Sequence, residues 1–321
     1  MSVPLNEQRR SELPLIAFTT CEPAALGVAL FGFTASLADG PSGAPVLSGL
    51  LSGDSVLGAS GALAAGALSA LIAWTLCSIG MLASIGHLAK PLRAPRSLAN
   101  LRSSWLSREI LLVGAFWVAL TAWVAASLAG SGTAALLFEA MGCVLGAILM
   151  YVIARAYQVS TRPTWCGPEG LMELWACVLG AGSAILFASA GASAVAVASP
   201  LAATVLAAAA LGGVALDVAS HCLRRQRLRA LVVSSDERVP LTLERYAGLW
   251  SFVSRLWVLE ALLCALLVAA LLAESLGAVP RIGIAAAAVA IAVGQIGVHA
   301  AHRYLFYETP VQVRWVARLR K

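Results

Sequence analysis

The stretch of the sequence that first suggests chemistry is a short basic segment, residues 86–110, between two strongly apolar ones. His87 ends the first apolar segment and Glu109 begins the next. Pro91 and Pro95 lie between them, and because proline interrupts a helix we expect two antiparallel helices joined by a loop. Such a hairpin places an imidazole and a carboxyl group at the same depth, below a cluster of basic side chains. A quinone headgroup suits this arrangement, because its carbonyls accept hydrogen bonds and its redox chemistry moves two protons with two electrons.

A purely structural interpretation of the same two residues stays open. A histidine at the end of one helix and a glutamate in the first turn of the next both complement the helix dipole. His87 and Glu109 would then be interfacial residues of an ordinary loop.

Composition identifies the class of protein. Of the 321 residues, 60% are hydrophobic and 12% are charged, whereas soluble domains are about 25% charged. Mean hydropathy is +0.85. The net charge of +6 therefore concerns membrane orientation and docking rather than nucleic-acid binding. We expect no secretory signal before the first helix, because Glu12 and Glu22 interrupt any apolar region of that kind.

Eight segments reach the length of about 20 apolar residues that a spanning helix needs. They predict an all-α fold, a bundle of eight transmembrane helices that makes residues 1–321 a single integral membrane domain. The expected spans are 13–37, 56–88, 109–129, 134–157, 171–188, 192–216, 247–273 and 282–306. The longest polar connection runs from residue 224 to residue 245.

The distribution of basic residues predicts the orientation. Eight spans place the N-terminus, every second loop and the C-terminal tail on one side, and 20 of the 22 Lys and Arg residues fall there. Arg281 lies on the opposite side and Arg255 lies within a helix. By the positive-inside rule, both termini are expected in the cytoplasm.

Ionisable residues within the spans are the remaining candidates for function, because charge inside a membrane is costly. All four histidines are expected near the side that carries the basic residues, which should face the cytoplasm: His87, His221, His299 and His302. Deeper positions are Glu22, Glu139, Asp217, Arg255 and Glu260. We expect Glu22 to border a site at His87, Arg255 and Glu260 to pair with other helices, and Glu139 to have a structural role.

The seven cysteines are scattered singly, and no CxxC pair occurs. We therefore expect no iron–sulfur cluster and no zinc site built from cysteine.

Five short motifs follow one another along the sequence at helix ends. They are ELPLIAFTT (12–20), HLAKPLRAPRSLAN (87–100), LSREI (106–110), RAYQVSTRPTW (155–165) and HRYLFY (302–307). Together they resemble the membrane anchor subunit of the dimethyl sulfoxide reductase family of molybdenum enzymes, with Asn100 one place later than in that family's pattern. The resemblance extends from the first helix to the last.

This resemblance implies an anchor for two partners, a molybdopterin catalytic subunit and a four-cluster iron–sulfur subunit, in a bacterial inner membrane. It implies exchange of electrons with ubiquinone or menaquinone, and no haem, iron–sulfur cluster, metal ligand or catalytic residue in this protein. The family's histidine and glutamate at the quinone site correspond to His87 and Glu109; we add Glu22 as a third member and Arg93 as an electrostatic tuner. Docking of the iron–sulfur subunit is assigned to basic residues of two loops: Arg96, Arg102, Arg224, Arg225 and Arg227.

The orientation points to one branch of these complexes. Respiratory dimethyl sulfoxide reductases export their catalytic subunits, whereas the motif-bearing side of this protein is the basic side, which should face the cytoplasm. The anchors of cytoplasmic sulfite dehydrogenases are similar in that respect. Oxidation of sulfite to sulfate, with electrons passed to quinone, is therefore the leading expectation.

Three alternatives remain. One is the quinol-oxidising anchor of an anaerobic dimethyl sulfoxide reductase. Another is a di-haem cytochrome b, for which His87 and His299 supply one histidine pair but no second pair is evident. The third, a transporter, is disfavoured because the ionisable residues gather at one surface and no inverted repeat is apparent.

Overall fold

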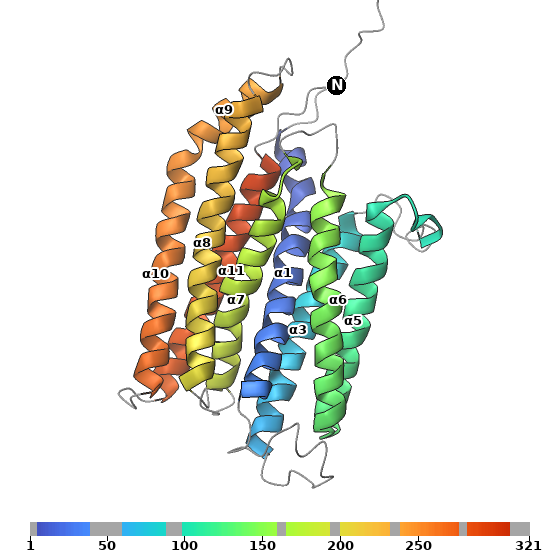
Figure 1. Ribbon diagram of the computed structural model, residues 1–321, viewed down its shortest axis with the longest axis vertical. Coiled ribbons are helices and arrows are strands. Elements are labelled where there is room, and N and C mark those ends of the chain that lie inside the picture. Colours follow the sequence, from blue (N-terminus) through green and yellow to red (C-terminus); the bar gives the residue numbers. More distant parts are fainter. Residues whose placement is uncertain are drawn as a thin grey trace, which may run out of the picture.

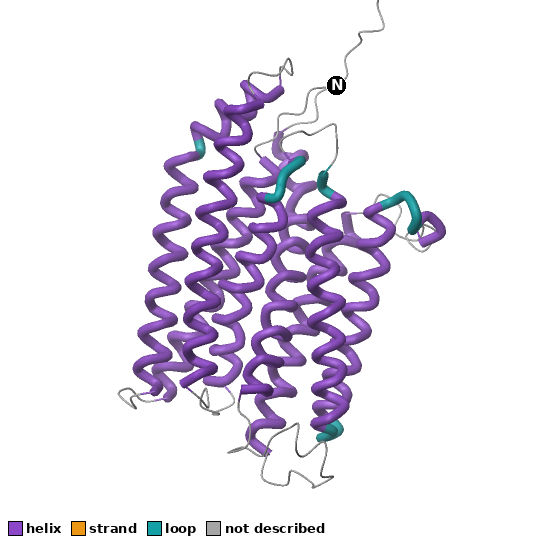
Figure 2. Tube along the Cα trace, viewed as in Figure 1, coloured by secondary structure: helices purple, strands orange, loops and turns teal. Residues whose placement is uncertain are grey.

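The computed structural model describes residues 5–38, 60–87, 98–158, 165–192, 200–231, 238–275 and 281–308. Eight long helices run side by side in alternating directions (Figure 1). They are α1 (Leu5–Ala38), α3 (Ser60–His87), α5 (Trp105–Leu128), α6 (Gly132–Ala156), α7 (Glu169–Ala192), α8 (Pro200–Leu231), α10 (Trp250–Ser275) and α11 (Arg281–Glu308). A 3-10 turn, η2 (Leu98–Asn100), and the short helix α9 (Arg238–Gly248) complete the described elements, among which there is no strand (Figure 2).

The helices have the length and surface of a membrane protein. Within the described ranges, eight are long and apolar enough to cross a membrane, which confirms the predicted all-α polytopic fold. Large apolar side chains point outward along them, including Leu82, Val118, Leu262 and Val293, each more than half exposed. Such a surface is favourable against lipid, so the chain is a multi-pass membrane protein.

Several boundaries differ from the sequence-based prediction: α1 begins at Leu5 rather than at residue 13, and α8 begins at Pro200 rather than at residue 192. The sixth span was expected to end at residue 216, but α8 continues to Leu231. It does so because His221, Arg224 and Leu228 are buried against neighbouring helices, so the polar turns are stabilised by packing rather than by hydropathy. The 224–245 connection also contains helix α9, which buries Thr242 and Tyr246, four residues apart, while Glu244 and Arg245 stay exposed.

The alternation of the helices brings the predicted basic segments to one end of the bundle, hereafter the basic end. The N-terminal end of α1, the last turn of α3, the first turn of α5 and helix α9 all lie there (Figure 1). The end of α3 and the start of α5 are thus at the same end, as the hairpin prediction required.

Helices α1 and α7 approach each other closely through one glycine from each. A methyl group on Gly27 would lie 2.3 Å from the Val178 carbonyl oxygen, and one on Gly182 would lie 2.4 Å from the Gly27 Cα. Backbone contacts this short leave no room for a side chain, so small residues are required where the two helices cross.

We therefore expect Gly182→Ala to destabilise the bundle, because backbone atoms cannot move aside as a flexible side chain would. Overpacking of this kind costs about 1–3 kcal/mol. Gly114→Ala is the matched control, since nothing lies within 4 Å of the added methyl group. Thermal unfolding of the detergent-purified protein measures both, and equal unfolding temperatures for the two variants would contradict the assigned crossing.

Candidate functional site

Glu22 lies at the centre of the first polar site, between α1 and α3. Its side chain is fully buried, and the Cys77 thiol is the hydrogen-bond partner that its carboxyl group has among the described residues. The carboxyl group lies against Gly80, where an added methyl group would come within 2.8 Å of Oε1, and beside the Cys77 thiol. Pro23 follows directly and cannot donate a backbone hydrogen bond to the Thr19 carbonyl. An unpaired buried carboxyl group is costly, so its retention indicates a function.

Glu109 approaches this carboxyl group from the basic end. It is 6% exposed, in the first turns of α5. The start of that helix is held by Ser104, whose hydroxyl accepts a hydrogen bond from the Ser107 backbone at 3.2 Å. Glu109 lies close enough to Glu22 for the two carboxyl groups to interact electrostatically. The structure thus brings together two of the four residues predicted for the quinone site.

The other two predicted residues cannot be placed. Helix α3 ends at His87, but the position of that side chain is outside the described residues. Arg93 lies outside them altogether. The roles assigned to His87 and Arg93 stay predictions.

An aromatic cluster connects Glu109 to the end of α11. Tyr157 packs edge-on against Trp165, Phe306 and Tyr307, with ring centroids 5.6–5.9 Å apart. Trp165 Nε1 donates a hydrogen bond to the Phe306 carbonyl at 3.0 Å. Desolvation by the surrounding rings, followed by the nearby Tyr307 and Glu109, raises the pKa of Tyr157 well above its usual value. Tyr157 is therefore a neutral phenol next to the acidic pair, hydrogen-bonded to the Tyr307 hydroxyl.

A buried ion-pair network stabilises the basic end between α7, α8 and α11. Glu173 pairs with Arg224 at 2.6 Å and with Arg303 at 3.1 Å. Arg303 also donates from Nε to the Thr19 hydroxyl at 3.1 Å, which attaches α11 to α1. Next to it, Arg227 pairs with Glu169 at 2.8 Å.

This network corrects part of the predicted docking set. Arg224 is 3% exposed, so its guanidinium group pairs with Glu173 inside the bundle and is inaccessible to a partner subunit. Arg225 lies over the ring of Trp250 at 4.3 Å, and Arg227 is held by Glu169. Arg102 is exposed, and Arg96 lies outside the described residues.

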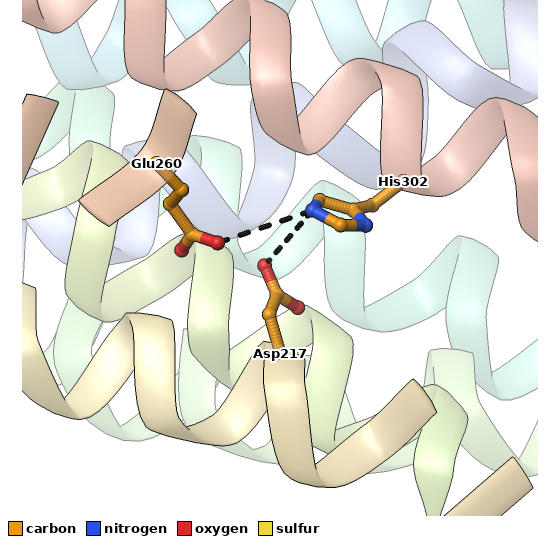
Figure 3. A group of neighbouring side chains, drawn as sticks. All are labelled: Asp217, Glu260 and His302. Atoms are coloured by element: carbon orange, nitrogen blue, oxygen red, sulfur yellow. Dashed lines mark ion pairs between the residues drawn. The ribbon is translucent and has the colours of Figure 1, made fainter. Parts of the chain in front are cut away.

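A second polar site, in which carboxylates and histidines meet, was not anticipated as a unit. Asp217 of α8, Glu260 of α10 and His302 of α11 converge on one point (Figure 3). His302 Nε2 lies 3.8 Å from Asp217 Oδ2 and 3.9 Å from Glu260 Oε2, and His299 Nδ1 lies 3.2 Å from Asp217 Oδ2. All are buried. The expectation that Glu260 pairs with another helix is confirmed, whereas Arg255 is exposed.

The sequence did carry a signal for this second site. Gln295, His299 and His302 recur at helical spacing on an otherwise apolar helix, and Asp217 and His221 lie four residues apart on another. Spacing alone does not reveal which helices face each other.

Glu173→Gln should destabilise the protein strongly, because it leaves two buried guanidinium groups without a carboxylate. Breaking a buried pair in this way costs about 3–5 kcal/mol. Glu244→Gln removes the same charge from an exposed position and should have little effect. Thermal unfolding and the yield of monodisperse protein in detergent report the difference; a Glu173→Gln variant as stable as Glu244→Gln would show that the network is not structural.

Comparison with known proteins agrees with this architecture. Residues 64–308 match the family described as DMSO reductase anchor subunit (DmsC). The anaerobic dimethyl sulfoxide reductase chain YnfH of Escherichia coli is 35% identical over 94 residues, which cover 29% of this protein and 33% of that relative. A subunit of the anaerobic dimethyl sulfoxide reductase of Haemophilus influenzae is 33% identical over 98 residues, 28% of this protein and 33% of the relative. The subunit of the same name from Escherichia coli is 37% identical over 95 residues, which cover 29% of this protein and 33% of that relative.

The aligned part thus spans about a third of the length of these curated relatives. No solved structure matches the protein. The family match covers most of the sequence, from the start of α3 to the end of α11, and the chain therefore belongs to the family of DMSO reductase anchor subunits.

Proposed function

We propose that this protein is the quinol-oxidising anchor of a three-subunit reductase of the dimethyl sulfoxide reductase type in a bacterial inner membrane. Its partners are an iron–sulfur subunit docked at the basic end and a molybdopterin catalytic subunit beyond it. The relatives named as parts of anaerobic dimethyl sulfoxide reductases support this choice of reaction. The observation that carries the quinone role is the buried pair Glu22 and Glu109 below the basic end.

The acidic pair suits the chemistry of quinol oxidation. Oxidation of a quinol to a quinone releases two protons and two electrons, and the protons need acceptors within hydrogen-bond reach. Glu109, the member nearer the basic end, takes a proton from the quinol hydroxyl and passes it toward water. Glu22 lies deeper and accepts the second proton, while the hydrogen-bonded phenols of Tyr157 and Tyr307 supply further polar groups beside Glu109.

The position of the acidic pair near the basic end also suits electron transfer to the iron–sulfur subunit. Electrons leave the quinol one at a time for the nearest iron–sulfur cluster of the partner, so the headgroup must bind close to the docking surface. Glu109, in the first turns of α5, meets that requirement. Arg102 is exposed at the same end and is the described arginine best placed to contact acidic groups on the iron–sulfur subunit.

Glu109→Gln in the assembled complex should lower quinol-linked turnover at least tenfold, equivalent to about 1.4 kcal/mol of transition-state stabilisation. His87→Leu should do the same if the imidazole holds a quinone carbonyl. Turnover with a soluble artificial electron donor should stay unchanged, because that route bypasses the membrane anchor. Normal quinol-linked rates in both variants would place the site elsewhere.

Two glycines of α3 supply a test that removes no functional group. Gly80→Ala places a methyl group 2.8 Å from the Glu22 carboxyl group and should displace it. Gly86→Ala adds the same group to the same helix with nothing within 4 Å. We expect a higher KM for quinol with Gly80→Ala and no change with Gly86→Ala. The same KM in both variants would exclude Glu22 from the site.

Sulfite oxidation in the cytoplasm is the second candidate, and the charge distribution favours it. Twenty of 22 basic residues lie on the motif-bearing side, which the positive-inside rule assigns to the cytoplasm. A reporter fused after Lys321 decides the orientation. A cytoplasmic signal, with sulfite-dependent reduction of quinone by membranes, would support this candidate, whereas a periplasmic signal would support an exported reductase.

A further inference from the structure

The carboxylate–histidine cluster of α8, α10 and α11 has the donors of a metal site. Asp217 Oδ2, Glu260 Oε2 and His302 Nε2 converge with separations of 3.8–3.9 Å from the imidazole nitrogen to the oxygens. A hydrogen bond needs about 2.7–3.2 Å, so His302 is not hydrogen-bonded to either carboxyl group, although the two carboxyl groups lie close enough to share a proton. Donors around a metal at bond lengths of about 2.0–2.2 Å are instead about 3.3–3.6 Å apart. The cluster is therefore slightly wider than a filled site, and small side-chain rotations close it.

Hydrogen bonds behind His302 orient its ring toward that point. His302 Nδ1 lies 2.7 Å from His221 Nε2, and the other nitrogen of His221 meets the Tyr246 hydroxyl. Tyr246 can donate its own proton to the His221 carbonyl at 3.4 Å. In that arrangement His221 donates to Tyr246, His302 donates to His221, and His302 Nε2 presents a bare lone pair to two carboxyl groups. Metal-binding histidines are held in this manner through their second nitrogen.

A second observation is independent of the three donors. Gln295 is fully buried, and neither its amide oxygen nor its nitrogen has a partner among the described residues. The Gln295 amide oxygen and His299 Nε2 lie on the same side of the cluster, both against Gly180 of α7. Apart from each other and the His299 imidazole, 3.2 Å from Asp217 Oδ2, the carboxyl groups of Asp217 and Glu260 have no hydrogen-bond partner in the described ranges. Buried polar atoms left unsatisfied cost about 1–3 kcal/mol each, so this many in one place indicates a missing ligand.

We propose that Asp217, Glu260 and His302 bind a divalent transition-metal ion of the Zn²⁺ type, with His299 as the nearest fourth donor. Imidazole nitrogen favours such ions over Mg²⁺ or Ca²⁺, which prefer oxygen. Two carboxylates neutralise the double positive charge, so the filled site has no net charge inside the membrane. This departs from the sequence-based expectation that the protein ligates no metal.

The surroundings favour a bound ion over a proton pathway. Along α11 the polar face ends at Gln295, and the next buried positions are all apolar: Ala292, Ile291, Ala288 and Ile284. Protons therefore have no polar continuation along this helix toward the other side. The filled site would join α8, α10 and α11, and its role is to hold these helices together independently of the quinone site at α1, α3 and α5.

The test uses the full-length protein purified in detergent without its partners, so that their iron and molybdenum do not interfere. Elemental analysis should find one transition-metal ion per molecule. After removal of metal with a chelator, Co²⁺ should restore one equivalent with visible d–d absorption. Asp217→Asn and His302→Gln should each weaken Co²⁺ binding at least about a hundredfold, and His221→Leu about 10- to 100-fold.

Glu139→Gln is the matched control, because Glu139 is also a buried carboxyl group but lies against Gly32, far along the sequence from the cluster residues. It should keep the metal. If the cluster variants fail to fold, the unmodified protein decides: chelation should lower its unfolding temperature and added Zn²⁺ should restore it. A protein without stoichiometric metal, Co²⁺ without d–d absorption, or full binding by Asp217→Asn would each overturn the site and leave a shared proton as its occupant.

Discussion

The contact of Gly27 with Gly182 is the constraint on which the rest of the bundle depends. Because neither residue has a side chain, α1 and α7 meet through their backbones at the centre of the molecule. Two side chains of α1 that lie less than one turn apart then contact different helices. Glu22 lies against Gly80 of α3, and Thr19 accepts a hydrogen bond from Arg303 of α11. A wider separation of α1 and α7 would move Glu22, on α1, away from the ion-pair network around Glu173, on α7.

Buried charge in this protein is of two kinds. Glu173 is shared between Arg224 and Arg303, so those charges neutralise each other within hydrogen-bond distance and connect helices. Glu22, by contrast, has no cation within such distance, and its hydrogen-bond partner among the described residues is the weakly polar Cys77 thiol. The first kind stabilises the fold. The second kind opposes folding, and a membrane protein retains it where a ligand or a proton compensates the charge.

Hydropathy and charge were sufficient to predict the eight spans, their alternation and the basic end, because each depends only on local composition. Contacts between helices were beyond that reasoning. Arg224 was assigned to a partner because its neighbours in sequence are basic, yet Glu173, 51 positions away in the sequence, holds it inside. The cluster of Asp217, Glu260 and His302 was not predicted for the same reason. Each was noted as an ionisable residue, but their convergence depends on how α8, α10 and α11 face one another.

The length of α8 has a consequence for the shape of the basic end. From Leu201 to Leu231 the helix runs for 31 residues, about 46 Å at 1.5 Å per residue, whereas a bilayer core is about 30 Å thick. Helix α8 and the attached α9 consequently rise above the ends of α5 and α6 (Figure 1). The described helices therefore end at two different heights at the basic end (Figure 1). A subunit that docked over the ends of α5 and α6 would contact the side of α8 and α9 (Figure 1). The shape of this end, and not only its charge, would then limit where such a subunit can bind.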